Sequence, residues 1–354
     1  MVDPRVKKLS KILIDYSLKV KSGEKVVISG AADAEQLIKE LYRLVLKKGA
    51  IPILDLSFDD STYDYYKLAN EKQLSNFPKH QYELIRNADA IARIYSPLNT
   101  RMLTNIDPKK VTLRNKTLKK IKDEMLKKRW VLVAYPTNAL AQEADMSLSE
   151  FQDFVYKATN IDWEKKKKEM EKIKKRLDGG NTVRIVGKDT DITFSIKGRK
   201  GIVCAGEYNM PDGEVFYSPI ETTTNGKISF SFPTIMQGRE VDGIVLEFMN
   251  GKVIKATATK NEKFLKEMLS ADAGAKYLGE FGIGLNYRLK KHIKNILFDE
   301  KLGGTIHLAL GNAYPEAQGT NKSSIHWDLI KDLRKEGKVY LDGDIVFEKG
   351  RWKV

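Results

Sequence analysis

Short apolar runs recur through the first half of the chain and alternate with stretches of helical periodicity. Such runs occupy residues 25–30, 51–56, 90–95 and 130–135, and an amphipathic pattern at residues 34–41 follows the first of them. Strands that alternate with helices in this way predict a mostly parallel sheet with helices on its faces. The turn at residues 30–33 lacks the glycine-rich dinucleotide fingerprint, and the sequence contains no Gly-Lys-Ser/Thr phosphate-binding loop. We therefore expect an α/β domain that binds no nucleotide cofactor.

A long helical stretch separates this region from a second half that is rich in strands. The helical pattern covers residues 147–177 and ends at Asp178-Gly179-Gly180-Asn181, which is a strong stop signal. Strand-like runs follow at residues 183–186, 192–196, 227–232, 243–248 and 325–352, with an Asn-Gly hairpin turn at residues 250–251 and a helical pattern at residues 261–278. We expect an α/β domain over residues 1–180, ending in a long basic helix, and an α+β domain with mainly antiparallel strands over residues 181–354.

The chain is basic, with 62 lysines and arginines against 47 acidic residues and a formal net charge of +15. Much of the excess lies in residues 164–176, where Glu164 and Lys168, and Glu171 and Lys175, have the i,i+4 spacing that supports a solvated helix. Enrichment in lysine and glutamate is also typical of proteins from hot environments. No zinc finger or RNA-binding aromatic motif accompanies the charge, so nucleic-acid binding is the weaker interpretation.

Cysteine content and the N-terminal sequence indicate the cellular compartment of the protein. The single cysteine, Cys204, can form no internal disulfide and no multi-thiolate zinc site. Residues 1–8 lead into an amphipathic stretch, which is not the apolar core of a signal peptide. No run of about 18 apolar residues occurs, so we expect no membrane span. These features predict a cytoplasmic protein.

Two of the four histidines lie in the last fifty residues, each in a strand-like context. In the run from Thr305 to Gly311, His307 shares one strand face with small residues, which leaves room for a cavity or an ion. His326 and Asp328 are two residues apart, so in an extended strand both side chains point to the same side and can bind one metal ion. In a helix they would diverge. A hydrogen-bonded structural histidine is the alternative at His307, and a solvated acid is the alternative at Asp328.

Two glutamates also lie in unusual contexts. Glu214 directly precedes an apolar strand start, in Pro211-Asp212-Gly213-Glu214-Val215-Phe216. Glu280 lies in Tyr277-Leu278-Gly279-Glu280, within a glycine-punctuated segment that we expect to be a loop after a helix. Glycines permit the backbone conformations that site loops require. Taken singly, each glutamate is more simply an exposed acid in an ordinary turn.

Taken together, these residues resemble a known family. The order Glu214, Glu280, His307, Tyr314, His326, Asp328 is similar to that of the thermophilic aminopeptidase family of metallopeptidases, of the aminopeptidase T and aminopeptidase S type. The resemblance is most specific at residues 211–216, 277–280 and 297–301 (Leu-Phe-Asp-Glu-Lys), and it continues through residues 305–316 and 326–328. It covers essentially the whole second domain and is looser in the first half.

The resemblance implies a dinuclear site in the second domain. It implies that two divalent metal ions (zinc, cobalt or manganese) are held by Glu214, Glu280, His307, His326 and Asp328, with Glu280 and Tyr314 as catalytic residues. Carboxylates with imidazoles suit these metals, and five ligands for two ions require a bridging carboxylate. Tyr314 would donate a hydrogen bond to the tetrahedral oxyanion. The general base is not identified, and Glu316 is a weak candidate for a supporting role.

The implied activity is removal of the N-terminal residue from short peptides with a free N-terminus, by a homodimer. Two other functions stay open at this point. One is a metal-dependent amidohydrolase of different specificity on the same scaffold. The other, from a different class, is a basic nucleic-acid-binding protein whose histidines are structural.

Overall fold

The computed structural model describes residues 2–58 and 60–353, and the chain divides into two compact units. The first unit comprises residues 1–161 with 206–211, and the second comprises residues 162–205 with 212–354. The sequence pattern placed the division after residue 180. In this partition, helix α9 (Trp163–Asp178) belongs to the second unit, and a short return of the chain adds one strand to the first.

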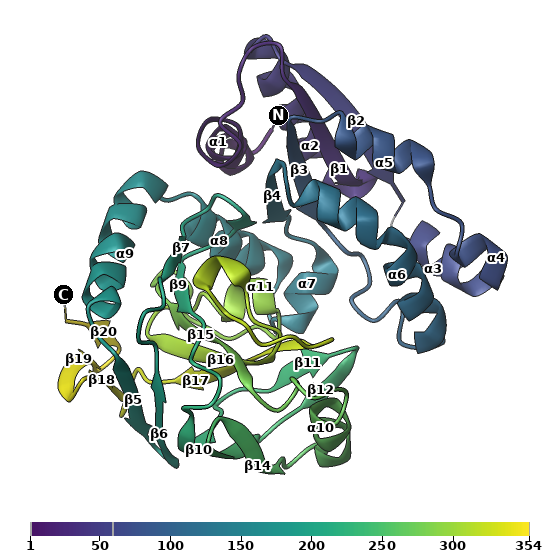
Figure 1. The fold of residues 1–354 in the computed structure, drawn as a ribbon. Coiled ribbons are helices and arrows are strands. Elements are labelled where there is room, and N and C mark those ends of the chain that lie inside the picture. Colours follow the sequence, from purple (N-terminus) through teal and green to yellow (C-terminus); the bar gives the residue numbers. More distant parts are fainter. Residues whose placement is uncertain (1, 59, 354) are drawn as a thin grey trace. The chain divides into compact units, whose positions relative to one another are not determined.

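The first unit is built on a five-stranded parallel sheet in the order β2-β1-β3-β4-β8 (Figure 1). Its strands are β1 (Lys25–Ala31), β2 (Ile51–Ser57), β3 (Ala90–Tyr95), β4 (Arg129–Ala134) and β8 (Asn209–Met210). The four predicted strands are therefore present, and β8 comes from the returning segment. Ile85 and Met125, from two helices, pack on Val27 and Ile91 of the sheet and form a buried cluster. The predicted α/β class is confirmed for this unit.

Helices connect the strands of this sheet. They are α1 (Pro4–Ile12) with the π-helix η1 (Leu13–Ser17), η2 (Ala32–Ala34), α2 (Glu35–Lys47), α3 (Ser61–Leu68), α4 (Glu71–Leu74), α5 (Lys79–Arg86), α6 (Pro108–Met125), α7 (Asn138–Glu143) and α8 (Leu148–Thr159). In the part of the chain that the structure describes, no helix is both long and apolar enough to cross a membrane.

The helical stretch predicted at residues 147–177 consists of two helices, α8 and α9. A capping box begins α8, in which Ser147 and Glu150 bond each other's backbone N–H groups. The Asp162 side chain accepts a hydrogen bond from the Lys165 N–H and begins α9 as a new helix. The predicted helical region is therefore present but interrupted at residues 160–162, because periodicity alone does not reveal the new N-cap. Helix α9 buries Trp163 and Leu177 and exposes most of its lysines, as expected of a solvated basic helix.

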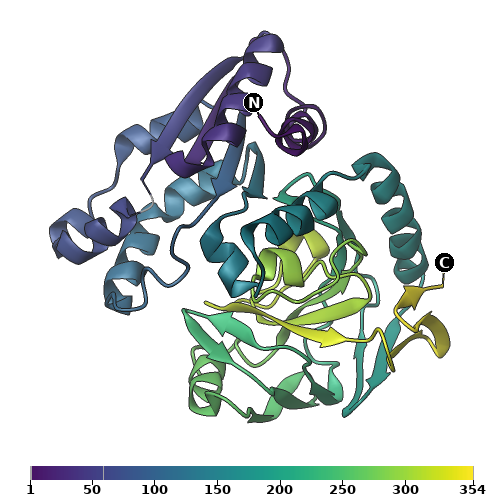
Figure 2. The same ribbon diagram turned by 180° about the vertical axis from the view of Figure 1, so that it is seen from behind.

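The second unit contains antiparallel sheets (Figures 1 and 2). An eight-stranded sheet has the order β14 (Lys252–Thr257), β13 (Val245–Met249), β10 (Asn225–Ser229), β6 (Thr190–Ser195), β5 (Thr182–Gly187), β18 (Lys338–Leu341), β19 (Asp344–Glu348), β20 (Arg351–Trp352). Strands β11 (Thr234–Met236) and β12 (Arg239–Val241) form a separate pair. The remaining helices are α10 (Glu262–Leu269), α11 (Ile296–Asp299) and η3 (Pro315–Ala317). The predicted antiparallel α+β architecture is confirmed.

A five-stranded antiparallel sheet carries the candidate site. Its order is β17 (His326–Asp332), β16 (Thr305–Gly311), β15 (Leu278–Gly284), β9 (Glu214–Tyr217), β7 (Ile202–Cys204). One face packs into the core, where Phe281 meets Phe194 of the eight-stranded sheet with ring centroids 5.1 Å apart. Because side chains alternate along each strand, the candidate site residues of β9, β15, β16 and β17 project from the opposite face: Glu214, Glu280, His307, His326 and Asp328.

Two expectations on this sheet are corrected. Glu280 was expected in a loop, but it lies inside β15 and is buried. The helix predicted over residues 261–278 ends at Leu269, and Leu278 is already part of β15. Glycines caused the first error, because Gly279, Gly282 and Gly284 are typical of a turn in sequence. In the fold, the backbone of β15 instead approaches its neighbours too closely for side chains at these positions.

Candidate metal centre

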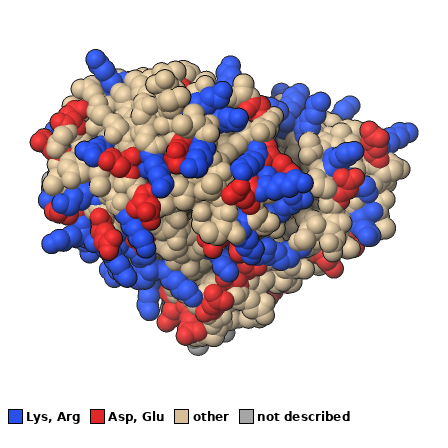
Figure 3. Space-filling view, turned by 90° about the horizontal axis from the view of Figure 1, so that it is seen from below, with Lys and Arg blue, Asp and Glu red and all other residues tan. Residues whose placement is uncertain are grey.

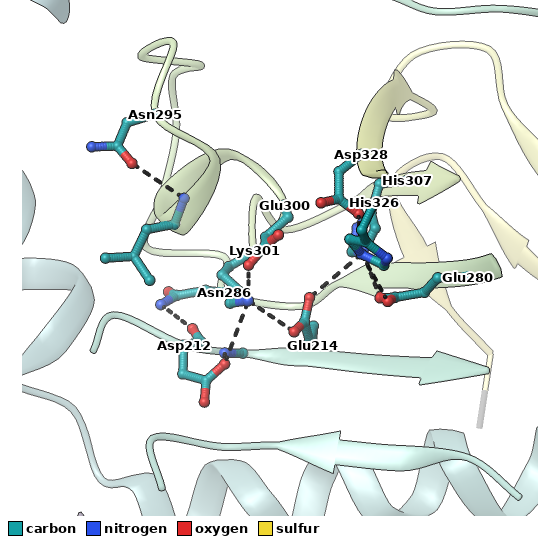
Figure 4. A network of polar contacts seen from close by, with 12 residues as sticks. Asp212, Glu214, Glu280, Asn286, Asn295, Glu300, Lys301, His307, His326 and Asp328 are labelled. Atoms are coloured by element: carbon teal, nitrogen blue, oxygen red, sulfur yellow. Dashed lines mark hydrogen bonds and ion pairs between the residues drawn. The ribbon is translucent and has the colours of Figure 1, made fainter. Parts of the chain in front are cut away.

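Strand register brings the predicted residues together. Gly282 lies opposite His307, Ala309 lies opposite Asp328, and Gly311 lies opposite His326. A Cβ built at Gly282 would lie 1.8 Å from His307 Nε2, so the missing side chain is what makes room for the imidazole. The structure therefore gathers the five proposed ligands Glu214, Glu280, His307, His326 and Asp328 in one cluster (Figure 4).

His307 lies at the centre of this cluster and is completely buried. Its Nε2 is 3.1 Å from Glu280 Oε1 and 3.6 Å from Glu214 Oε2. Both carboxylates come from neighbouring strands, β15 and β9. The expected cavity between small residues is therefore filled by acidic groups, which is the environment that a cation requires.

His326 is oriented by the backbone. Its Nδ1 lies 2.8 Å from the Asn312 carbonyl oxygen, so this nitrogen carries the hydrogen and donates to the carbonyl. The other nitrogen, Nε2, lies 3.4 Å from Asp328 Oδ1 and 3.5 Å from Glu280 Oε2. A histidine held by a backbone carbonyl through one nitrogen, with the other facing carboxylates, is the usual arrangement of a metal-ligating histidine.

Two overlapping groups in the described part of the chain have the spacing of metal ligands. Glu214, Glu300 and His307 form one, and Glu280, His307 and Asp328 form the other. Within each group, the potential ligand atoms lie within 4.8 Å of one another. The two oxygens of Glu280 face different imidazoles, Oε1 toward His307 and Oε2 toward His326. This carboxylate therefore lies between the two histidines.

Glu300 and Lys301 are the residues that sequence reasoning missed. Both belong to the Leu-Phe-Asp-Glu-Lys segment, which carried the resemblance but was assigned no chemistry. Lys301 is fully buried, and its Nζ donates to Glu214 Oε1 at 2.8 Å and makes a short contact with Glu300 Oε1 (Figure 4). The segment itself was the sequence feature that could have indicated them. Charged residues that directly follow an apolar Leu-Phe pair can be drawn into the interior with it, unlike those of a solvated turn.

The electrostatics of the cluster reflect its excess of carboxylates. Burial lowers the pKa of His307, but the contacts with Glu280 and Glu214 outweigh it and raise the pKa to about 9. Burial also lowers the pKa of His326, but the contacts with Asp328 and Glu280 outweigh it and raise the pKa to about 10. Burial raises the pKa of Glu280 and of Glu300, although the neighbouring cationic groups oppose it. The cluster therefore attracts protons to its imidazoles, as it would attract a metal cation in their place.

Unpartnered buried atoms test whether the residues fit a metal. Glu214 Oε2, His307 Nδ1 and Asp328 Oδ1 are buried and have no hydrogen-bond partner among the described residues. A buried polar atom without a partner is costly in a folded protein. Two of the three are carboxylate oxygens that face the imidazoles, where a bound cation would satisfy them. The donor set, which contains oxygen and nitrogen but no sulfur, fits zinc, cobalt or manganese.

Tyr314 lies at the edge of the cluster, directly before η3. Its ring centroid is 4.9 Å from that of His326 and 5.5 Å from that of Phe216. Burial and the neighbouring carboxylates raise the pKa of Tyr314, so its hydroxyl keeps its proton near neutral pH. With 40% of its surface exposed, it can be reached by a substrate. Glu316, the weak candidate for a supporting role, is exposed on η3, whereas Glu300 is the further carboxylate beside the cluster.

A comparison with protein families decides the classification. The family described as thermophilic metalloprotease (M29) matches residues 2–352. The chain belongs to this metalloprotease family. The resemblance noted in the sequence is thereby confirmed, and it extends over the looser first half as well. Membership makes the chain a metallopeptidase, a hydrolase of peptide bonds that uses divalent metal ions.

Aminopeptidase relatives match this metalloprotease over nearly its full length. It is 24% identical over 403 residues to aminopeptidase 2 of Geobacillus stearothermophilus, covering 98% of this chain and 97% of that protein. It is also 24% identical over 405 residues to aminopeptidase T of Thermus thermophilus, covering 99% and 98%. The solved structure of wild-type AmpT from Thermus thermophilus superposes with a TM-score of 0.87 at 22% identity and covers 99% of both chains. This likeness shows that the fold is shared.

Proposed function

We propose that this metalloprotease is a dinuclear aminopeptidase that removes the N-terminal residue from short peptides. The observation that carries the proposal is the pair of overlapping ligand groups around His307, with two buried carboxylate oxygens that a bound cation would satisfy. The names of the relatives, aminopeptidase 2 and aminopeptidase T, support the exopeptidase specificity.

Each of the two metal ions would have its own ligands. One would be held by Glu214, Glu300 and His307, and the other by His326 and Asp328. Glu280 would bridge them, since its two oxygens face His307 and His326 respectively. Glu300 is thus a sixth ligand, added to the five expected from the sequence.

The residues around the metals have separate tasks in hydrolysis. When bound, divalent metals at these positions would polarise the scissile carbonyl and lower the pKa of a water molecule. The Tyr314 hydroxyl, which its raised pKa keeps protonated, would donate a hydrogen bond to the developing oxyanion. The acidic cluster would bind the free α-amine of the peptide, which restricts cleavage to the first residue.

A homodimer is part of the same proposal. Strand β2 is an edge of the first unit's sheet, and its residues Ile51, Leu54 and Leu56 are 51%, 46% and 45% exposed. An exposed apolar edge strand is a surface that a second copy of the chain would cover. Light scattering coupled to gel filtration distinguishes a dimer from a monomer directly.

The test of the activity is release of the N-terminal residue from di- and tripeptides. The assay is run on protein as purified, after chelation, and after addition of cobalt, zinc or manganese. We expect activity to disappear on chelation, to return with metal, and to be absent on N-acetylated peptides, with about two metal ions per chain. Cleavage of acetylated substrates alone would indicate an amidohydrolase of another specificity.

The charge pattern favours the enzyme over a nucleic-acid-binding protein. Figure 3 shows a face on which acidic side chains are interspersed among the lysines and arginines. Several lysines and arginines of the chain pair with carboxylates, as Lys174 does with Asp178 at 2.6 Å and Arg184 with Asp191 at 2.6 Å. A protein that binds none of the added metals, cleaves no peptide in their presence and shifts a DNA probe at low salt would reverse this choice.

A further inference from the structure

Lys301 is an ammonium group among carboxylates in the interior of the second unit. Its Nζ is 2.8 Å from Glu214 Oε1 and 3.9 Å from Asp212 Oδ1, and it also contacts Glu300 (Figure 4). The side chain is 0% exposed, and Asp212 beside it is also 0% exposed. A charge in such a position is maintained only by its partners, because leaving a buried charge unpaired is strongly unfavourable.

The backbone fixes where this ammonium lies. The Asn286 N–H donates to the Lys301 carbonyl at 2.9 Å, and the Asn286 side-chain amide donates to the Asp212 carbonyl at 2.9 Å. One asparagine thus ties the lysine to the segment that leads into Glu214, at the start of β9. The Lys301 backbone is therefore held beside this segment, and its buried side chain reaches Glu214 from there.

The contact with Lys301 gives the two carboxylate oxygens of Glu214 different surroundings. Oε1 accepts the hydrogen bond from the ammonium, while Oε2 is buried without a hydrogen-bond partner among the described residues and lies 3.6 Å from His307 Nε2. Lys301 therefore turns one oxygen of Glu214 toward itself and the other toward the imidazole. This is the orientation of a carboxylate prepared to bind a cation through one oxygen.

We propose that Lys301 is a resident cation of the metal centre. It holds Glu214 and Glu300 in place when no metal is bound, and it weakens metal binding at the position next to them. It is a positioning residue, since it acts on the substrate only through these carboxylates. The inference rests on the proposed function, in which Glu214 and Glu300 bind a metal.

The two effects follow from the same charge. Without metal, the ammonium is a nearby counter-charge for the carboxylates, so its removal leaves them buried and repelling one another. With metal, the dications supply that counter-charge, and the ammonium repels them. Loss of the lysine charge therefore destabilises the metal-free protein more than the metal-bound protein. By linkage, the same variant must bind metal more tightly than the wild type.

Lys301→Met tests this, with Lys331→Met as the matched control. Lys331 is also buried, at 4% exposure, but its Nζ donates to neutral oxygens, the Lys188 carbonyl at 2.7 Å and Ser229 Oγ at 3.0 Å. Both variants remove one buried ammonium from the same unit. Thermal unfolding is followed with chelator and with saturating zinc or cobalt, and the affinity and number of bound ions are measured by calorimetric titration.

In Lys301→Met we expect the melting temperature of the metal-free protein to fall by roughly 6–20 °C, and saturating metal to restore most of the loss. Metal affinity at one of the two positions should rise by about tenfold or more. Lys331→Met should lower the melting temperature equally with and without metal and leave the affinity unchanged. Unchanged or weaker metal binding by Lys301→Met, with about two ions still bound to the wild type, would overturn the proposal.

Two further measurements distinguish failure of the proposed function from failure of the proposed role of Lys301. A wild-type protein that binds no metal would refute the proposed function and this inference with it. If Lys301→Met does not fold without metal, the double variant Lys301→Met/Glu300→Gln removes one carboxylate charge together with the ammonium. Recovery of the metal-free fold in the double variant supports the charge-balance role, and continued failure to fold contradicts it.

Discussion

Gly282→Ala provides a sharp test of the site geometry, because one methyl group would displace one ligand. The added Cβ would lie 1.8 Å from His307 Nε2 and 2.0 Å from Cε1, whereas real Cβ contacts are essentially never below 3.0 Å. The imidazole must therefore move by more than about 1 Å, away from Glu280 and Glu214. A misplacement of about 1 Å at a reacting centre costs on the order of a hundredfold in rate.

We expect Gly282→Ala to lower kcat/KM by about a hundredfold and to weaken metal binding at least tenfold. The overpacking should cost about 1–3 kcal/mol of unfolding free energy, so the protein should still fold. The assays are peptide hydrolysis at saturating metal, metal titration and thermal unfolding. These separate loss of the site from loss of the fold.

Gly187→Ala is the matched control for this substitution. Gly187 is also a strand residue, at the end of β5, and a Cβ there would meet its nearest neighbour, Leu333 Cδ2, at 3.6 Å, an ordinary contact. This variant should keep wild-type activity and metal binding. Normal metal affinity and turnover in Gly282→Ala would mean that His307 is not a ligand in the arrangement described.

Three other variants make separate predictions. Tyr314→Phe should lower kcat by about 10- to 1000-fold with two metals still bound, since it removes only an oxyanion donor; unchanged turnover would exclude that role. Cys204→Ser should leave turnover unchanged, because burial raises the pKa of the thiol and so disfavours a nucleophilic thiolate near neutral pH, and Cys204 belongs to neither ligand group of the described residues; a large loss of activity would reveal a function for it. His292, stacked on Phe232 and 3.2 Å from Asp299, has its pKa lowered to about 4 by burial, so the unfolded chain binds the proton more readily. The contribution of His292 to stability should therefore fall by about 3 kcal/mol as the pH falls from 6.5 to 4. Burial raises the pKa of Asp299 to about 7, which acts in the opposite direction, so denaturant unfolding across that window should show the loss as a difference between wild type and His292→Gln.

Alternation along strands was enough to predict how three side chains of the candidate site are oriented. His326 and Asp328 do share a face of β17, and His307 does project from the face it shares with Thr305 and Ala309. These predictions depend only on a period of two within one strand. They succeeded because the geometry is local and no partner strand is needed to deduce it.

The residues that sequence reasoning missed depend on contacts between distant segments. Lys301 and Glu300 reach the cluster from the turn after α11, and Lys301 meets Glu214 across 87 positions of the chain. Periodicity does not identify a buried ammonium, and the Leu-Phe-Asp-Glu-Lys segment alone does not show which residues Lys301 meets. The break between α8 and α9 was missed for a related reason, since it depends on one capping side chain at Asp162.

The glycines that led to the prediction of a loop at β15 are residues that the candidate site requires. Along this strand, a Cβ at Gly279 would meet the Gly311 carbonyl oxygen at 2.5 Å, and one at Gly284 would meet the Leu302 carbonyl oxygen at 2.2 Å. Between them, Gly282 leaves the space that the His307 imidazole occupies. A strand with ordinary side chains at these positions would be easier to predict, but those side chains would collide with the Gly311 and Leu302 carbonyl oxygens and with the His307 imidazole. Gly282 leaves the space in which His307 Nε2 lies 3.1 Å from Glu280 Oε1, so a residue that weakens the local strand signal is one that this arrangement needs.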